Sequence, residues 1–140
     1  MAKIIEFNTG YCTHPACVIT NSFSFTKMKF PAKAWLIQSN GKNYLWDTGY
    51  AEYFFEKKIS HKIYGLVTPV HIQEHLIKLL EEQGIADKDI SGIFLSHLHA
   101  DHCAGLKDFP HNKIFLHQDC EQLLKETSSL KLLINGCLPS

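Results

Sequence analysis

The sequence predicts an α/β fold, because segments typical of strands alternate with segments typical of helices along the chain. Ile90 to Leu95 is a short apolar run typical of a buried strand, and helix-like segments lie on both sides of it. Upstream, two strand-like segments flank Asn40-Gly41, a dipeptide that favours the tight turn of a β-hairpin. We therefore expect a sheet with packed helices, formed as a single domain over residues 1–140.

Local patterns predict the individual elements. Strands are expected over residues 3–8, 33–38, 42–47, 90–95 and 113–117, and helices over 51–58, 70–83 and 118–125. The helix over 70–83 is predicted from an apolar stripe at i, i+4, i+7 and i+8 from Ile72, and Gly84 is a typical residue to end it. The segment 9–31 contains glycine and prolines and is expected to be irregular.

Composition narrows the class of protein. Apolar residues make up 45% of the chain, which is typical of a globular protein. Lys+Arg and Asp+Glu are both 14, so the net charge is zero, and no partner such as nucleic acid or an anionic membrane is expected. No apolar run approaches the roughly 18 residues that a membrane span needs, and no signal peptide is evident. The five cysteines form no CxxC pair and are expected to be free thiols in a cytoplasmic protein.

The residues that suggest chemistry lie directly after the strand predicted at 90–95. The run Ser96-His97-Leu98-His99-Ala100-Asp101-His102 places four potential metal ligands within six residues, at the strand end where α/β proteins usually bind ligands. His97 and His99 can converge on one cation, and Asp101 and His102 can turn toward a second. Zinc accepts imidazole nitrogen and carboxylate oxygen, and its catalytic sites leave one position open for water.

These motifs resemble the metallo-β-lactamase superfamily, whose signature is HxHxDH after a short apolar strand. Leu45-Trp46-Asp47-Thr48-Gly49 is similar to the upstream DTG element of that family, which also follows a hairpin. The stretches 30–32, 47–50 and 67–70 resemble the branch that includes N-acyl-homoserine-lactone lactonases. The resemblance implies half of an αββα sandwich, with a mixed sheet and outer helices.

The resemblance also implies a function, namely a metal-dependent hydrolase in which zinc-bound hydroxide attacks a lactone or a related ester. His97 and His99 would bind the first metal, and Asp101 and His102 the second, with Asp101 also a catalytic residue. Zinc is the implied cofactor, as two ions in the complete family site, and other divalent metals stay open. Asp47 would support the histidine loop without binding metal itself.

The family completes its site downstream with a third histidine, a bridging aspartate and a last histidine, whereas this sequence ends at Ser140. We therefore expect an N-terminal, apparently truncated part of the fold that hydrolyses its small-molecule substrate poorly by itself. One face of the sheet would lack a covering layer, so a homo-oligomer is expected, most simply a two-fold dimer. That face would carry some of Trp35, Ile37, Leu45 and Trp46.

Two alternatives stay open from the residues alone. His71-Ile72-Gln73-Glu74-His75 spells HxxEH, the inverted zincin motif. In that peptidase motif, histidines at i and i+4 of one helix share a zinc, and Glu74 would act as general base. The other alternative is a non-catalytic metal-binding half-domain. Zinc uptake after changes at either histidine pair, together with an assay of hydrolysis, discriminates among these functions.

Overall fold

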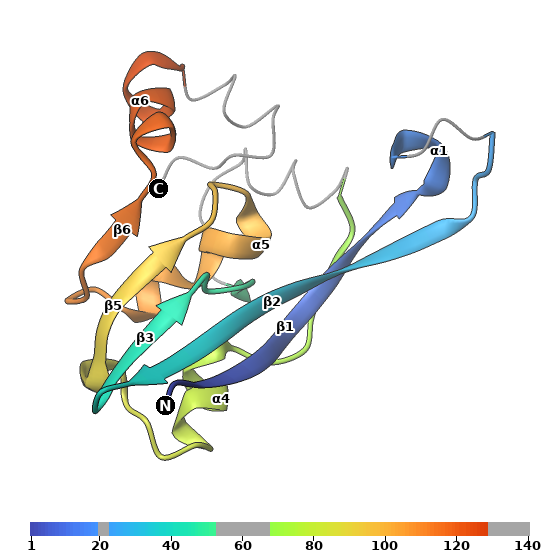
Figure 1. Cartoon of the computed structure of the whole chain (residues 1–140). Coiled ribbons are helices and arrows are strands. Elements are labelled where there is room, and N and C mark those ends of the chain that lie inside the picture. Colours follow the sequence, from blue (N-terminus) through green and yellow to red (C-terminus); the bar gives the residue numbers. More distant parts are fainter. Residues whose placement is uncertain (20–22, 53–67, 129–140) are drawn as a thin grey trace.

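A computed structural model describes residues 1–19, 23–52 and 68–128 and shows one mixed sheet of six strands (Figure 1). Its order is β4-β1-β2-β3-β5-β6. The strands are β1 (Lys3–Pro15), β2 (Lys27–Ser39), β3 (Lys42–Trp46), β4 (Val70–Ile72), β5 (Ile90–Leu95) and β6 (Ile114–Leu116). Strand β1 pairs antiparallel with β2 and β4, and β2 pairs antiparallel with β3. The neighbours β3, β5 and β6 are parallel.

Helices α4 and α5 lie on the same face of this sheet (Figure 1). The described helices are α1 (Ala16–Ile19), α4 (Leu76–Glu81), α5 (Ala100–Cys103) and α6 (Gln118–Glu126), with short 3-10 turns at Asp87–Asp89 and Ala104–Asp108. The main core joins Leu36 of β2, Leu45 of β3 and Ile93 of β5 to Leu76 and Leu80 of α4, and all five are at most 1% exposed. The predicted fold class is therefore confirmed, as a mixed sheet with helices packed on it.

The hairpin turn between β2 and β3 forms as the sequence predicts. Asn40 and Gly41 both have positive φ angles, 50° and 72°, as a type I′ turn requires. The prediction of irregular structure over 9–31 is wrong, because β1 continues to Pro15 and β2 already begins at Lys27. Proline is tolerated there because β3 pairs only with the part of β2 from Trp35 onward, so Pro31 has a strand partner on one side alone.

The predicted helix over 70–83 is also corrected. Residues 70–72 form strand β4, and the helix spans only Leu76–Glu81. Strand β4 pairs closely with β1 at Gly10, whose φ is 150° and where any Cβ would collide with the backbone of His71. Pairing with a distant strand thus overrides the local helical pattern. Gly84, with φ 73°, follows the last turn as predicted.

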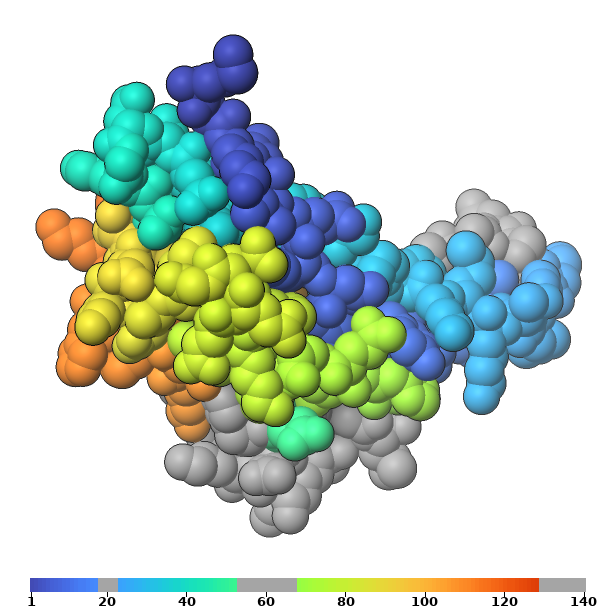
Figure 2. Space-filling model, turned by 90° about the horizontal axis from the view of Figure 1, so that it is seen from below, coloured from blue at the N-terminus to red at the C-terminus, as the bar shows by residue number. Residues whose placement is uncertain are grey.

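The far end of the β1–β2 hairpin projects from the rest of the chain (Figure 2). The predicted helix over 51–58 lies almost wholly outside the described residues, and so does Cys137. The four cysteines within the described ranges are free thiols. None of the helices in those ranges has the length and apolar character to cross a membrane.

Candidate metal centre

The parallel pairing of β3 and β5 builds the site. Trp46 of β3 lies beside Phe94 of β5, so the chain leaves both strands at the same edge of the sheet. Asp47 directly follows Trp46, and its N–H donates to the carbonyl oxygen of Phe94 at 2.8 Å. Ser96 and the histidine loop follow β5 at that same edge. Two segments about fifty residues apart in sequence are thereby brought into contact.

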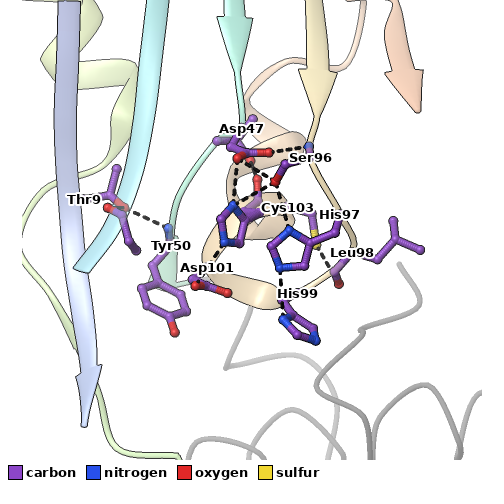
Figure 3. Close-up of polar contacts among 12 residues, drawn as sticks. Thr9, Asp47, Tyr50, Ser96, His97, Leu98, His99, Asp101 and Cys103 are labelled. Carbon is purple, nitrogen blue, oxygen red and sulfur yellow. Dashed lines mark hydrogen bonds and ion pairs between the residues drawn. The ribbon is translucent and has the colours of Figure 1, made fainter. Parts of the chain in front are cut away.

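Asp47 is the buried anchor of this arrangement, with only 1% of its surface exposed. Its φ of 62° is unusual for a residue other than glycine and turns the chain sharply after β3. Oδ1 accepts a hydrogen bond from the backbone N–H of Ser96 at 2.8 Å. Oδ2 accepts from the Ser96 hydroxyl at 2.8 Å (Figure 3) and also from Nδ1 of His102 at 2.7 Å. The structure therefore places Asp47 within hydrogen-bonding distance of the loop.

The four potential ligands lie in two pairs. Nε2 of His97 is 3.0 Å from Nδ1 of His99. Nε2 of His102 is 3.2 Å from Oδ2 of Asp101. The rings of His97 and His102 are neighbours, with centroids 4.0 Å apart, so the two pairs adjoin each other. One loop thus presents three imidazoles and one carboxylate in a single cluster.

The segment 47–50 is held between the histidine loop and the long hairpin. Both the N–H and the hydroxyl of Thr48 donate to the carbonyl oxygen of His102, at 2.7 and 3.0 Å. Gly105 packs so closely on this segment that a Cβ there would lie 2.6 Å from the carbonyl oxygen of Thr48. The loop backbone and the segment after β3 are therefore fixed relative to each other.

The other side of this segment is anchored to β1 through Thr9. A bulge between Asn8 and Gly10 interrupts the β1–β2 register, and Thr9 is fully buried. Its Oγ1 accepts from the N–H of Tyr50 at 2.9 Å (Figure 3) and donates to the carbonyl oxygen of Ala32 at 3.2 Å. Gly49 fits against Thr9 because it has no Cβ to collide with the threonine side chain.

The carboxylates around His102 govern the electrostatics of the cluster. Burial disfavours the charged imidazole, but the hydrogen bonds and negative charges of Asp101 and Asp47 outweigh it and raise the pKa of His102 to about 9. Burial alone would raise the pKa of Asp101, yet the bond to His102 and its positive charge lower it. For His97, burial and then the positive charges of His102 and His99 lower the pKa. At neutral pH the ring of His102 is therefore protonated on both nitrogens, and a cation that binds Nε2 must displace the proton on that atom.

The donor chemistry of the cluster suits zinc. Two ligands that share one tetrahedral zinc at about 2.0–2.1 Å are themselves ~3.3 Å apart, and both donor pairs have nearly this spacing. Within the described residues, no group of three or more His, Cys, Asp or Glu side chains is arranged to hold a metal ion. Each of the two pairs could supply two donors to one ion.

The two histidines of the HxxEH motif, and also His117, lie outside the cluster. His71 is in strand β4 and stacks on Tyr11, with ring centroids 4.8 Å apart, whereas His75 precedes α4. An inverted zincin motif needs both histidines on one helix, and residues 71–75 do not form a helix. The structure therefore does not support a peptidase function for this motif. His117 caps the N-terminus of α6, where its side chain accepts from the N–H of Asp119.

Three polar contributors were not identified from the sequence. Ser96 and Thr48 bond directly to the cluster, and Thr9 anchors the segment that carries Asp47. Ser96 and Thr48 stand next to recognised motif residues, which is a signal that could have been used. Thr9 carries no such signal, because its inward orientation depends on a bulge that only strand pairing produces.

Comparison with known families agrees with this geometry. The sequence profile of the metallo-beta-lactamase superfamily matches residues 29–117, which include most of β2, all of β3 and β5, and the whole histidine loop. The chain therefore belongs to the metallo-β-lactamase superfamily, and the motif-based recognition of the family is confirmed.

Solved structures share the fold. An N-acyl homoserine lactone hydrolase with N-hexanoyl-L-homoserine bound at its catalytic metal centre superimposes with a TM-score of 0.70 and 18% identity, over 90% of this chain and 52% of that one. A probable metal-dependent hydrolase from Staphylococcus aureus gives 0.69 and 22%, over 91% and 50%. The dizinc quorum-quenching lactonase AidC gives 0.62 and 19%, over 94% and 47%. The chain spans about half the length of these proteins.

Proposed function

We propose that this chain supplies the HxHxDH half of a zinc-dependent hydrolase that opens a lactone or a related ester. The proposal rests above all on the two adjoining donor pairs, His97 with His99 and Asp101 with His102, each spaced for one ion. The similar structures support the substrate class, because one of them holds a lactone-derived product at its metal centre. Imidazole and carboxylate donors suit zinc, and they also bind other divalent transition metals.

The residues of the chain have distinct tasks in this proposal. His97 and His99 would hold one ion, and Asp101 and His102 the other. The chemistry that such ions supply when bound is polarisation of the carbonyl and a lowered pKa of water. Asp47 keeps the proton on Nδ1 of His102, so that Nε2 of that ring is directed to the metal side. Thr48 holds the backbone of the loop in place at the carbonyl oxygen of His102.

Zinc uptake tests the metal centre. Elemental analysis of purified, dialysed protein should show that His97→Ala removes most of the zinc. The double change His71→Ala/His75→Ala is the matched control and should leave uptake unchanged, because neither side chain belongs to the cluster. An equal loss of zinc in both variants would refute this centre.

Hydrolysis tests the reaction. The zinc-loaded chain is incubated with an N-acyl-homoserine lactone, and ring opening is followed by the release of acid. Because the described cluster offers two donors for each ion, we expect weak turnover that His97→Ala abolishes. Zinc binding with no turnover above that of His97→Ala would instead support the alternative of a non-catalytic metal-binding half-domain. The cytoplasmic location stays a prediction.

We also propose that the chain forms a two-fold dimer through the sheet face opposite α4. That face carries a row of aromatic residues that runs across four neighbouring strands. Trp46 lies opposite Trp35 of β2 and Phe94 of β5, and Phe94 in turn lies opposite Phe115 of β6. Trp46 is 41% and Phe115 43% exposed, and the rings of Phe94 and Phe115 stack at 4.7 Å. Leu45, expected as a candidate for this face, instead points into the core.

The dimer is tested by light scattering over a dilution series. A contiguous apolar patch of this kind favours association, worth about 25 cal/mol per Å² of apolar surface buried. We expect a dimer that Trp46→Lys dissociates. Ile114→Lys is the matched control, because Ile114 is similarly exposed but lies on the other face of the sheet. Its strand partner is Ile93, whose side chain faces the core. A folded wild-type monomer at micromolar concentration, or equal effects of both variants, would contradict the proposed interface.

A further inference from the structure

We propose that Ser96 is a positioning residue that fixes the tautomer of His97, so that this imidazole presents an unprotonated Nε2 to the metal. The inference rests on the proposed metal centre and extends it to a residue outside the ligand set. It concerns the direction of each hydrogen bond around the Ser96 hydroxyl. That hydroxyl lies between Asp47 and His97 (Figure 3), and it is also 3.2 Å from Nδ1 of His102.

The single proton of the Ser96 hydroxyl is committed to Asp47. A carboxylate only accepts hydrogen bonds, and a serine hydroxyl donates one and accepts up to two. Oγ of Ser96 lies 2.8 Å from Oδ2 of Asp47, so Ser96 must be the donor of that bond. A second bond, from the Ser96 N–H to Oδ1 of Asp47 at 2.8 Å, fixes the carboxylate in position beside Ser96. Only the lone pairs of Oγ then remain for other partners.

The protonation pattern of His97 follows from this direction. Nδ1 of His97 lies 2.9 Å from Oγ of Ser96, which can only accept there, so Nδ1 must carry the proton. In a neutral imidazole the other nitrogen, Nε2, is then an acceptor with a free lone pair. Nε2 is also the atom that faces Nδ1 of His99 at 3.0 Å, and these two nitrogens are the pair that would hold the proposed ion. The hydroxyl of Ser96 thus prepares the correct nitrogen of His97.

The same hydroxyl also orients a ring from the second donor pair. Nδ1 of His102 donates to Oδ2 of Asp47 at 2.7 Å and lies 3.2 Å from Oγ of Ser96. Both imidazoles therefore turn Nδ1 toward the Asp47–Ser96 pair and Nε2 away from it. Ser96 connects the buried Asp47 to the ring of His97. Among the described residues, Asp47 makes no direct hydrogen bond to that ring.

The tautomer is tested first in the unaltered, metal-free chain. Long-range ¹H–¹⁵N NMR correlations distinguish an imidazole protonated at Nδ1 from one protonated at Nε2, and the His97→Gln spectrum identifies the resonances. We expect the Nδ1-protonated form for His97 at neutral pH. A His97 ring protonated at Nε2 would overturn the inference, and this measurement needs no variant of Ser96 to fold.

Zinc affinity is tested next, by competition with a chromophoric chelator. Loss of a group that orients a ligand typically weakens metal binding about 10–100-fold. We expect such a loss for Ser96→Ala, near wild-type affinity for Ser96→Thr, which keeps the hydroxyl, and no change for the control Ser91→Ala, an exposed serine in β5. In Ser96→Ala the His97 signal should also shift toward the Nε2-protonated form.

The outcomes separate this inference from the proposed function. If the wild-type chain binds zinc and Ser96→Ala binds it equally well with an unchanged His97 tautomer, the role of Ser96 is refuted while the metal centre stands. If the wild-type chain binds no zinc, the proposed function fails, and the NMR measurement still decides whether Ser96 sets the tautomer of His97.

Discussion

Replacing Asp47 with asparagine should destabilise the metal-free chain substantially, although the two side chains have nearly the same size. Asp47 is 1% exposed and accepts three hydrogen bonds, from the N–H and hydroxyl of Ser96 and from Nδ1 of His102. An asparagine amide can replace only one of the two oxygens as acceptor. In either orientation its NH₂ group would face at least one of these donors.

The magnitude follows from those three bonds. A hydrogen bond to a charged group contributes about 1.5–3 kcal/mol, and a buried donor left without a partner costs about 1–3 kcal/mol. With one side of the carboxylate lost and the negative charge beside His102 removed, we expect Asp47→Asn to lower the free energy of unfolding by about 2–4 kcal/mol at neutral pH. The pKa of His102 should fall as well, because Asp47 is one of the groups that raise it.

Urea unfolding monitored by the fluorescence of Trp35 and Trp46 measures the loss, and NMR titration measures the pKa of His102. Asp119→Asn is the matched control, since that side chain is 86% exposed at the start of α6, and it should change stability by no more than about 0.5 kcal/mol. If Asp47→Asn is as stable as Asp119→Asn, or if the pKa of His102 does not fall, Asp47 does not anchor the histidine loop.

Two further perturbations probe the surroundings of Asp47. Gly49→Ala should lower the free energy of unfolding by about 2–4 kcal/mol in the same urea assay. The reason is that φ at Gly49 is 68° and that the added Cβ would collide with the side chain of Thr9. A loss below about 1 kcal/mol would contradict this packing. Folding raises the pKa of His102 from its ordinary value of about 6.5 to about 9, which corresponds to a stabilisation of about 3 kcal/mol. This contribution is fully present below about pH 6.5 and is lost as the pH rises through about 9. Unfolding curves across that range should show this slope for the metal-free wild type but not for His102→Gln, and equal slopes would be inconsistent with the charged His102.

Much of the site is predictable because its donors are local in sequence. His97, His99, Asp101 and His102 fall within six residues, so any compact loop after β5 keeps them close together. The hairpin at Asn40-Gly41 is equally local, since positive φ at both residues is a property of the dipeptide. The association of Asp47 with the loop was predicted through family resemblance, because nothing in the spacing between the two segments indicates it.

The errors arose where pairing between distant strands outweighed a local pattern. Ile72 continues an apolar stripe that is typical of a helix, yet it pairs with Gly10 in the sheet. Pro31 suggested a break, yet it lies in β2 opposite Tyr11. In both cases the backbone hydrogen bonds of a neighbouring strand decide the conformation, and the neighbour is known only once the sheet is formed.

The sequence by itself determined which candidate metal ligands lie together, because ligand type and close spacing are properties of a short segment. Only the tertiary structure decided how those side chains are oriented. The parallel pairing of β3 with β5 brings Asp47 to Ser96, and in our proposal the direction of the hydrogen bond between them sets which nitrogen of His97 is free. Such bonds connect residues 49 to 55 positions apart, and their geometry depends on strand register and burial rather than on the local order of residues.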